Sequence, residues 1–237
     1  MRSMPPIAVL AGGLATRMQP ATLSVPKSML EIAGEPFIAH QLRLFRREGV
    51  ERVVLCLGYL GEQVAAFVTD GGHYGLQVAY SYDGDVLLGT GGALRQALPL
   101  LGEEFLVTYG DSYLDIPVRP VVDAFCAAST SGLMTVFHNA GRWDTSNIEF
   151  ADGQIIDYSK KPTARMSYID FGLTMLSASA LATFAEGEAF DLADVYRRLV
   201  REGRMAGLEV DRRFYEIGSP AGRAETDTYL RQQMAMR

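Results

Sequence analysis

Two adjacent glycines and two cations near the start of the chain are the first residues whose spacing suggests chemistry. Gly12 and Gly13 follow the apolar run 7–10, and Arg17 and Lys27 come soon after them. Glycine backbone can present N–H groups to an anion without obstruction by a Cβ, and the two cations add charge suited to phosphates. The stretch contains neither a Walker loop nor the dinucleotide fingerprint. A Gly-Gly pair alone is more often a tight turn, but the combination predicts a triphosphate site.

A lone carboxylate and a second glycine-rich stretch extend this set. Asp111 follows the apolar run 105–109 and Gly110. In open α/β sheets, ligands bind outside the carboxyl ends of strands, where such an Asp can hold a metal; a plain Asx turn is the alternative. The stretch LGTGGAL, residues 88–94, taken alone favours a helix N-terminus with Thr90 as its cap.

The elements that must position these residues alternate between strand and helix. Short apolar runs at 7–10, 52–57, 76–80 and 105–109 predict strands, the first of them central. Helices are expected from Pro36 to Gly49, around 64–68, and over about 92–98. Crossover helices between parallel strands are right-handed almost without exception, so this half predicts a doubly wound, Rossmann-like sheet.

The second half of the chain has a different texture. After a helix around 121–125, the segments 132–138, 147–150, 154–158 and 168–175 are strand-like, with a turn at Asp152-Gly153. Helices over about 191–202 and 219–234 flank a short strand at 214–217. We find no internal repeat and no linker, so we expect one domain with a more antiparallel β region.

Composition excludes several function classes. The chain of 237 residues has 22 Lys and Arg against 28 Asp and Glu, a net charge of −6, and no basic cluster that would indicate nucleic-acid binding. Its apolar runs are too short to span a bilayer. Cys56 and Cys126 lie in apolar surroundings without metal-ligand spacing, which predicts buried free thiols in a reducing cytoplasm. Histidine-based metal hydrolysis and a serine nucleophile elbow have no supporting motif.

The stretch AGGLATRMQPAT, residues 11–22, together with Pro26-Lys27, closely resembles the signature of the sugar-1-phosphate nucleotidyltransferases, also called sugar-nucleotide pyrophosphorylases. The resemblance implies that the loop wraps a nucleoside triphosphate, that Arg17 grips the leaving pyrophosphate, and that Lys27 contacts phosphate near the reacting centre. It also implies that LGTGGAL lies against the nucleobase and that Asp111 binds Mg²⁺. The nucleotide-binding residues are then Leu10, Ala11, Gly12, Gly13, Thr16, Arg17, Gly89, Gly91 and Gly92, and the catalytic residues are Arg17, Lys27 and Asp111.

The resemblance continues more loosely in the second half. Lys161, in SKKP, matches a lysine that binds the sugar phosphate, and Asn147 matches an asparagine that contacts the sugar, although an Asn bonding its own turn is the alternative. Asp170-Phe171-Gly172 matches Asn-x-Gly, with Asp170 on a sugar hydroxyl and Gly172 allowing close approach. Glu216, in FYEIGSP, stands where the family has its second magnesium ligand, usually Asp. The loop 138–147, with Trp143, either lines the sugar pocket or is a surface hairpin.

The family implies a Rossmann-like three-layer α/β fold with a mixed, mostly parallel sheet and a small antiparallel β subregion. Within one domain, residues 1–130 are then the nucleotide-binding half and residues 131–237 the sugar-binding half. A phosphate monoester is mostly a dianion at neutral pH and needs no general base. Nucleotidyl transfer to a sugar 1-phosphate, with release of pyrophosphate, therefore depends on positioning, charge neutralisation and Mg²⁺.

The identities of base and sugar rest on one turn. LGTGGAL looks most like the heptose 1-phosphate guanylyltransferase branch, which favours GTP and D-glycero-D-manno-heptose 1-phosphate as substrates in cell-surface polysaccharide synthesis. Uridylyl (including the N-acetylmuramate 1-phosphate type), thymidylyl and cytidylyl transfer stay open, as does a catalytically silent sugar-nucleotide-binding protein. A cytoplasmic enzyme without membrane or nucleic-acid partners is expected, and a homo-oligomer is possible because relatives are often dimers or tetramers.

Overall fold

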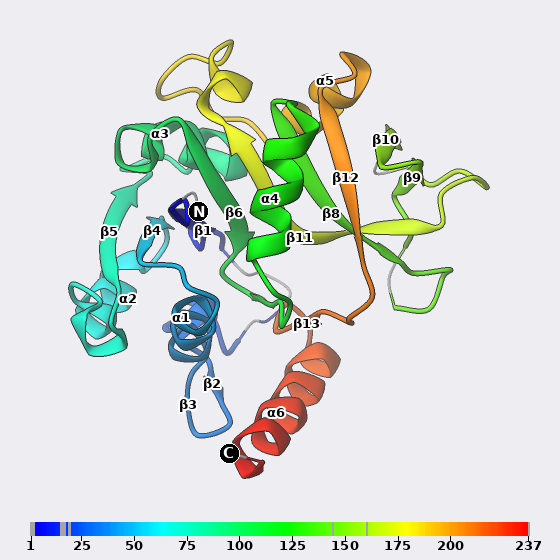
Figure 1. Ribbon diagram of the computed structural model, residues 1–237. Helices are drawn as coiled ribbons and strands as arrows, with labels where there is room; N and C mark the ends of the chain where they lie inside the picture. The colour runs from blue at the N-terminus through cyan, green and yellow to red at the C-terminus, as the bar shows by residue number, and fades with distance from the viewer. Residues whose placement is uncertain (1–2, 15–17, 19, 144, 160, 237) are drawn as a thin grey trace.

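A computed structural model describes residues 3–14, 18, 20–143, 145–159 and 161–236 of the protein. One nine-stranded sheet runs through the molecule (Figure 1). Its strand order is β5-β4-β1-β6-β11-β8-β12-β10-β9. The strands are β1 (Ile7–Leu10), β4 (Arg52–Leu57), β5 (Gln77–Tyr82), β6 (Glu104–Tyr109), β8 (Gly132–His138), β9 (Ile148–Ala151), β10 (Gln154–Tyr158), β11 (Tyr168–Ser177) and β12 (Met205–Val210). The helices are α1 (Phe37–Arg47), α2 (Gly61–Val68), α3 (Gly89–Leu101), α4 (Arg119–Ala128), α5 (Leu192–Arg201) and α6 (Pro220–Ala235).

The first half forms the parallel part of the sheet. β1 pairs in parallel with both β4 and β6, and β4 pairs in parallel with β5, so the prediction of a central first strand is confirmed. Alternate residues of β1 enter different cores: Ile7 and Val9 pack with α1, α2 and α4, whereas Ala8 and Leu10 pack with α3 and α5. The helices therefore cover both faces of the sheet, which confirms the three-layer α/β fold.

The second half continues the same sheet. β11 pairs antiparallel with β6 and β8, and β9 and β10 form a hairpin around Asp152 and Gly153, both at positive φ. One strand, β12, is absent from the sequence-based expectation. Its segment is short and interrupted by Gly207, where a Cβ would lie 2.5 Å from the ring of Phe150. Gly207 therefore weakens the strand pattern in the sequence, and it is also the residue whose missing side chain lets the Phe150 ring pack against β12.

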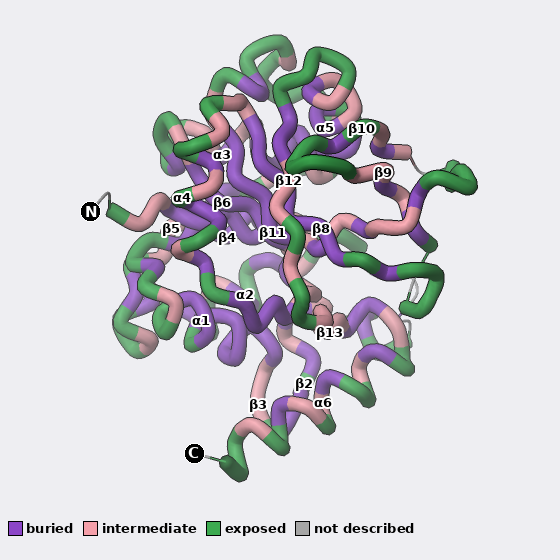
Figure 2. The backbone as a smooth tube through the Cα atoms, turned by 45° about the vertical axis from the view of Figure 1, so that its right-hand side comes forward, coloured by how far each residue is buried: buried purple, intermediate pink, exposed green. Residues whose placement is uncertain are grey.

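The C-terminal segment returns to the first half. The short strand β13 (Tyr215–Glu216) pairs with β7 (Ser112–Tyr113), and α6 lies beside the hairpin β2 (Glu31–Ile32) and β3 (Glu35–Pro36) (Figure 1). The Asp227 carboxylate accepts a hydrogen bond of 2.7 Å from the Ala33 amide. Figure 2 shows the result: the central strands are buried, whereas α6 keeps one exposed side. This return brings Glu216 to the end of β6.

Two expectations about the whole chain can be compared with the structure. Among the described residues, no helix is both long and apolar enough to cross a membrane. Cys56 is buried, as expected, but Cys126 is exposed on α4, so the prediction of a buried thiol was wrong there. The periodicity of α4 explains the difference, because Val121, Val122 and Phe125 occupy its buried face and leave position 126 outside.

Candidate active site

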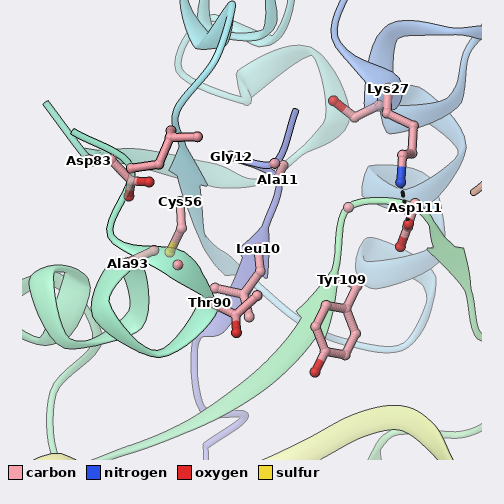
Figure 3. Close-up of a pocket in the computed structure, with 15 residues that line it drawn as sticks. Leu10, Ala11, Gly12, Lys27, Cys56, Asp83, Thr90, Ala93, Tyr109 and Asp111 are labelled. Carbon is pink, nitrogen blue, oxygen red and sulfur yellow. Dashed lines mark hydrogen bonds and ion pairs between the residues drawn. The ribbon is translucent and has the colours of Figure 1, made fainter. Parts of the chain in front are cut away.

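A cavity of about 250 Å³ opens at the carboxyl ends of β1 and β6, where the sequence predicts the triphosphate site (Figure 3). Seven of the residues expected to bind nucleotide or act in catalysis line it: Leu10, Ala11, Gly12, Gly13, Lys27, Gly89 and Asp111. The other lining residues are Ser28, Cys56, Asp83, Leu87, Thr90, Ala93, Tyr109 and Gly110. Thr16 and Arg17 lie outside the described residues, so their roles stay predictions.

The glycines around this cavity serve two purposes. A Cβ on Gly58 would lie 2.7 Å from the carbonyl oxygen of Gly12, and a Cβ on Gly110 would lie 2.6 Å from the Cβ of Ala11. These glycines let the ends of three neighbouring strands approach closely. Gly13 differs, because a Cβ there would meet nothing within 4 Å. The backbone at Gly13 therefore borders open space, as a phosphate-binding position requires.

Lys27 and Asp111 form the charged centre of the cavity. Lys27 Nζ donates to Asp111 Oδ2 at 2.9 Å, the contact drawn dashed in Figure 3. Ser112 Oγ donates to the other carboxylate oxygen at 3.3 Å, and the Ile217 amide donates to the Asp111 carbonyl at 2.9 Å. Both side chains are partly exposed. When substrate enters, the Lys27 ammonium can therefore reach a phosphate oxygen, and the Asp111 carboxylate can reach a metal ion.

Glu216 approaches the same point from β13. In the β7–β13 pair, Glu216 lies opposite Ser112. A Cβ on Gly218 would lie 2.9 Å from Glu216 Oε2 and 3.3 Å from Asp111 Oδ2, so the two carboxylates converge on one small volume. Mg²⁺ is commonly held by one or two carboxylates plus substrate phosphates, and this pair fits that requirement. No group of three or more potential metal ligands occurs among the described residues.

The longer arm of Glu216 is accommodated by the start of α6. Its carboxylate accepts hydrogen bonds from the Gly218 amide and, at 2.6 Å, from Ser219 Oγ. Ser219 is also the N-cap of α6 and accepts from the Gly222 amide. A Cβ on Gly222 would lie 1.7 Å from Glu216 Oε1. Glycine at 222 is thus what gives room for Glu at 216.

The glycine-rich turn before α3 is held by a distant segment. Thr90 is not the cap of α3; its hydroxyl donates to Asp191 Oδ1 at 3.1 Å and accepts from the Leu192 amide at 2.9 Å. A Cβ on Gly91 would lie 2.3 Å from the Phe190 ring, and one on Gly92 would lie 2.4 Å from the Glu188 carbonyl oxygen. Of the three glycines expected at the nucleobase, only Gly89 lines the cavity; Gly91 and Gly92 have a packing role.

Asp83 is a carboxylate in the cavity lining that the sequence-based prediction does not include. It follows β5 and is partly buried, and its Oδ2 accepts from the Leu88 amide at 3.2 Å. Burial raises the pKa of the Asp83 carboxyl, and the pKa of the neighbouring Cys56 thiol is raised to about 12, mainly by burial. The thiol is therefore unreactive. The rule that led to Asp111, a carboxylate just beyond a strand, applies equally to Asp83 and could have found it.

Three of the four expected sugar-binding residues, Asn147, Asp170 and Gly172, gather around a bulge in β11. Its register against β8 shifts between Asp170 and Thr174, and Gly172 lies inside the bulge with φ +98°. Asp170 Oδ1 accepts from the Gly172 amide at 2.9 Å. Asn147 Oδ1 accepts from the Asp170 amide at 3.2 Å, so Asn147 bonds across to β11 and not within its own turn. Bulges commonly redirect side chains beside active sites.

Asp170 lies among phenol groups. Burial raises its carboxyl pKa to about 6, against a small opposing effect of the Gly172 amide. Its charge in turn raises the pKa values of Tyr158 and Tyr196, although burial is the main cause for both. Tyr109 is also in this group and lines the cavity, so it connects the nucleotide side with the Asp170 side.

Lys161 and the 138–147 loop lie away from the cavity lining. The Lys161 side chain is exposed, and its amide donates to Ser159 Oγ at 3.0 Å. Trp143 is 46% exposed and packs under Arg213, whose guanidinium lies 3.7 Å from the ring centre. In the described pairings, β8 and β9 on either side of the loop each pair with β11 and not with each other, so the structure does not support a hairpin. Residues 140–143 and 145–146 of the loop line a second cavity together with Pro162 and Met166.

The chain resembles known proteins over most of its length. Residues 7–220 match the family model described as nucleotidyl transferase. An N-acetylmuramate alpha-1-phosphate uridylyltransferase of Neisseria meningitidis is 31% identical over 222 residues, covering 89% of this chain and 92% of the relative. A D-glycero-alpha-D-manno-heptose 1-phosphate guanylyltransferase of Campylobacter jejuni is 25% identical, covering 90% and 94%. A UTP–glucose-1-phosphate uridylyltransferase of Synechocystis is 25% identical, and the match spans only 59% of its length.

Solved structures agree on the fold. The crystal structure of HddC from Yersinia pseudotuberculosis superposes with a TM-score of 0.80 at 21% identity, covering 96% of this chain and all of that one. HddC has also been solved in complex with GMP-PN. The chain therefore belongs to the nucleotidyl transferase family, as one of its sugar-1-phosphate nucleotidyltransferases.

Proposed function

We propose that this enzyme transfers the guanylyl group of GTP to a sugar 1-phosphate, with D-glycero-D-manno-heptose 1-phosphate as the acceptor. The observation that carries the choice of base is Asp83. Its carboxylate lines the cavity, and in the described part of the chain the Leu88 amide is its one hydrogen-bond partner. An ionised carboxylate only accepts hydrogen bonds. Guanine is the base that offers two adjacent donors, N1–H and the N2 amino group, whereas uracil flanks its single N–H with two acceptors.

Two relatives support the same choice. The Campylobacter relative is named a heptose 1-phosphate guanylyltransferase, and the Yersinia structure has been solved with a guanine nucleotide analogue. The turn LGTGGAL, which resembles the heptose branch, places Gly89 and Thr90 at the cavity. These observations favour GTP and a heptose phosphate together.

The reaction needs little covalent chemistry from the protein. The sugar phosphate is already a nucleophile, so the chain must hold two polyanions in line and neutralise the charge that develops. In this proposal the backbone at Gly12 and Gly13 binds phosphate oxygens, Arg17 stabilises the leaving pyrophosphate, and Lys27 moves its hydrogen bond from Asp111 to phosphate. Asp111 and Glu216 would hold Mg²⁺, which when bound supplies positive charge to the phosphate oxygens.

The acceptor side is assigned to the β11 bulge. We propose that Asp170 accepts a hydrogen bond from a sugar hydroxyl, that Asn147 and the Gly172 backbone border the sugar, and that Lys161 reaches its phosphate. Asp170 and Asn147 are already linked by a hydrogen bond, so a shift of one would move the other. Residues 1–130 then serve mainly the nucleotide and residues 131–237 mainly the sugar.

A second candidate, uridylyl transfer to N-acetylmuramate 1-phosphate, is favoured by the 31% identical Neisseria relative. Pyrophosphate release from GTP, UTP, dTTP, CTP and ATP, each with heptose, N-acetylmuramate, mannose and glucose 1-phosphates, separates the two. Release with GTP and the heptose phosphate is the expected result. Preference for UTP would overturn the guanylyl assignment, and nucleotide binding without release from any pair would indicate a silent binding protein.

The role of Asp83 has its own test. Asp83→Asn should lower kcat/KM for GTP by roughly 5- to 150-fold, the equivalent of about 1 to 3 kcal/mol for a lost bidentate base contact, with less effect on UTP. The exposed neighbour Asp85 is a matched control, since it lies in the same turn but does not line the cavity. An equal loss for both triphosphates would show that Asp83 does not read the base.

A further inference from the structure

One polar side chain of α1 is buried against the end of β6. Gln41 is 1% exposed, and its Nε2 donates to the Tyr109 carbonyl at 2.9 Å and to the Ser112 carbonyl at 2.7 Å. These two carbonyls flank Gly110 and Asp111. The orientation of the amide is fixed by its partners, because the reversed amide would place Oε1 against two other acceptors. Gln41 therefore spans the turn that carries Asp111.

In the part of the chain that the structure describes, Gln41 gives the 109–112 turn its hydrogen bonds from α1, and the turn makes further contacts that matter to the site. The Gly110 amide donates to the Leu10 carbonyl, which ties the turn to the start of the phosphate loop. The Asp111 carbonyl accepts from Ile217, and Ser112 lies opposite Glu216 in the β7–β13 pair. A change in the span from Tyr109 to Ser112 would consequently move both carboxylates, Asp111 directly and Glu216 through its strand partner.

Burial alone does not explain a glutamine at this position. Its neighbours on the buried face of α1 include Ile38, Leu42 and Phe45, and an apolar side chain would suit that face. The Oε1 atom of Gln41 has no hydrogen-bond partner among the described residues, which costs stability in a buried group. The gain from this side chain lies in the two bonds that its amide nitrogen donates.

We propose that Gln41 is a positioning residue for nucleotidyl transfer. It holds the turn 109–112 so that the Asp111 carboxylate stays in register with Lys27 and Glu216. The inference rests on the proposed function, since it assigns Gln41 a role through Asp111. A role of this kind affects the chemical step more than nucleotide affinity, because among the described residues the hydrogen bonds of Gln41 go to the 109–112 turn and not to Gly12, Gly13 or Asp83.

The test is a double-mutant cycle between Gln41 and Asp111. Gln41→Met keeps the length of the side chain and removes its donors, and it should lower kcat by about 10- to 100-fold, the usual scale for a small misplacement of reacting groups, with KM for GTP within about twofold. In an Asp111→Asn background the same change should have no further effect on kcat, because the group it positions is already absent. Equal losses in both backgrounds, or a lower melting temperature with unchanged kcat, would overturn the proposal.

A matched control exists one residue before Tyr109. Thr108 is 1% exposed and its hydroxyl has no partner among the described residues, so Thr108→Val makes a comparable buried polar-to-apolar change without removing the two hydrogen bonds of Gln41 to the 109–112 turn. Activity close to wild type is expected. If Gln41→Met does not fold, Gln41→Asn retains the amide on a shorter arm and should show the same coupling to Asp111.

A crystal structure of Gln41→Met gives a result that does not depend on the substrates. A displaced 109–112 turn, with loss of the Lys27–Asp111 contact, is expected. An unchanged turn would overturn the role of Gln41 whatever the base and sugar prove to be. Conversely, absence of pyrophosphate release by the wild-type enzyme with a displaced turn in the variant would refute the proposed substrates and leave the positioning role supported.

Discussion

The two sides that we propose for the active site, one for the triphosphate and one for the acceptor sugar, are built by different means. The phosphate side consists of backbone at the ends of parallel strands, Gly12 and Gly13 after β1 and Gly110 after β6. The proposed acceptor side consists of side chains in the antiparallel region, Asn147 just before β9 and Asp170 beside a bulge in β11. Parallel pairing alone determines the position of the phosphate side, since it brings the carboxyl end of each strand beside the carboxyl end of the neighbouring strand. The second side depends on where a bulge falls and on which side chains meet across it.

This difference separates the part of the site that must stay constant among nucleotidyltransferases from the part that can vary with the sugar. The phosphate side must bind the same polyphosphate in every nucleotidyl transfer, and backbone donors suit a ligand that does not change. The acceptor side must distinguish among sugars, and single side chains can do so at the cost of one substitution each. Two of the departures from the family pattern, Asp170 for Asn and Glu216 for Asp, lie on the proposed acceptor side and at the proposed metal site.

The largest effect is expected at the charged centre of the phosphate side. Lys27→Ala or Asp111→Asn should each lower kcat by roughly 10²- to 10³-fold, the usual loss for one preorganised electrostatic group. Steady-state pyrophosphate release measures this, with the exposed Asp123→Asn as control. Near-normal turnover in both variants would contradict the proposed mechanism, in which Lys27 and Asp111 on the phosphate side promote the chemical step.

The residues of the phosphate side could be predicted because their signals are local. A buried strand, two glycines and a carboxylate just beyond a strand are each visible within a few residues, and Gly12, Gly13, Lys27 and Asp111 all line one cavity. The central position of β1 and the helices on both faces followed from the same alternation. Asp83, directly after β5, obeys the same local rule and is predictable in the same way.

Other features could not be predicted, because distant segments decide them. Thr90 looks like a helix cap in isolation, yet Asp191 and Leu192 take its hydrogen bonds. Gly207 looks like a break in a strand, yet it is what Phe150 requires. The orientation of Asn147 toward β11 depends on a register that no single segment specifies. Contacts between residues far apart in the sequence produce no periodic pattern in the sequence, so they cannot be predicted from it.

The junction between the two sides gives the second prediction. Gly222→Ala should displace the Glu216 carboxylate, because the new Cβ would lie 1.7 Å from Glu216 Oε1. We expect kcat to fall by about 10- to 100-fold if misplacement of a metal ligand resembles that of other reacting groups. The double variant Gly222→Ala, Glu216→Asp should recover much of the activity, since the shorter arm relieves the clash.

Ala221→Gly is the control for this experiment, since it perturbs the same turn of α6 without approaching Glu216. A loss in Gly222→Ala that Glu216→Asp does not rescue would mean that the damage is to the helix and not to the carboxylate.

The third prediction separates two glycines that look alike in sequence. Gly91→Ala should destabilise the fold by about 1 to 3 kcal/mol, since its Cβ would meet the Phe190 ring at 2.3 Å in a packed region. Gly13→Ala should leave stability nearly unchanged, because its Cβ meets nothing, but should raise KM for the triphosphate. Urea unfolding and steady-state kinetics on both variants measure the two effects. The reverse pattern would exchange the roles assigned to the two glycine-rich turns.

The smallest effect tests the acceptor side through its acid. Burial raises the pKa of Asp170 to about 6, above its ordinary value near 4, so ionisation of this carboxyl disfavours the folded state at neutral pH. Asp170→Asn should therefore stabilise the protein at pH 7 by about 1 to 2 kcal/mol, allowing for its partial exposure. As pH falls through 6 toward 4 the wild-type carboxyl gains its proton in the folded state first, so the difference should shrink and vanish below about pH 4. Urea unfolding at pH 7, 5.5 and 4.5 follows this directly. A variant less stable than wild type at pH 7, or a stability difference independent of pH, would contradict this prediction. Either result would show that contacts in the bulge stabilise the Asp170 carboxylate, so that keeping an acid at this position of the proposed acceptor side costs the fold no stability.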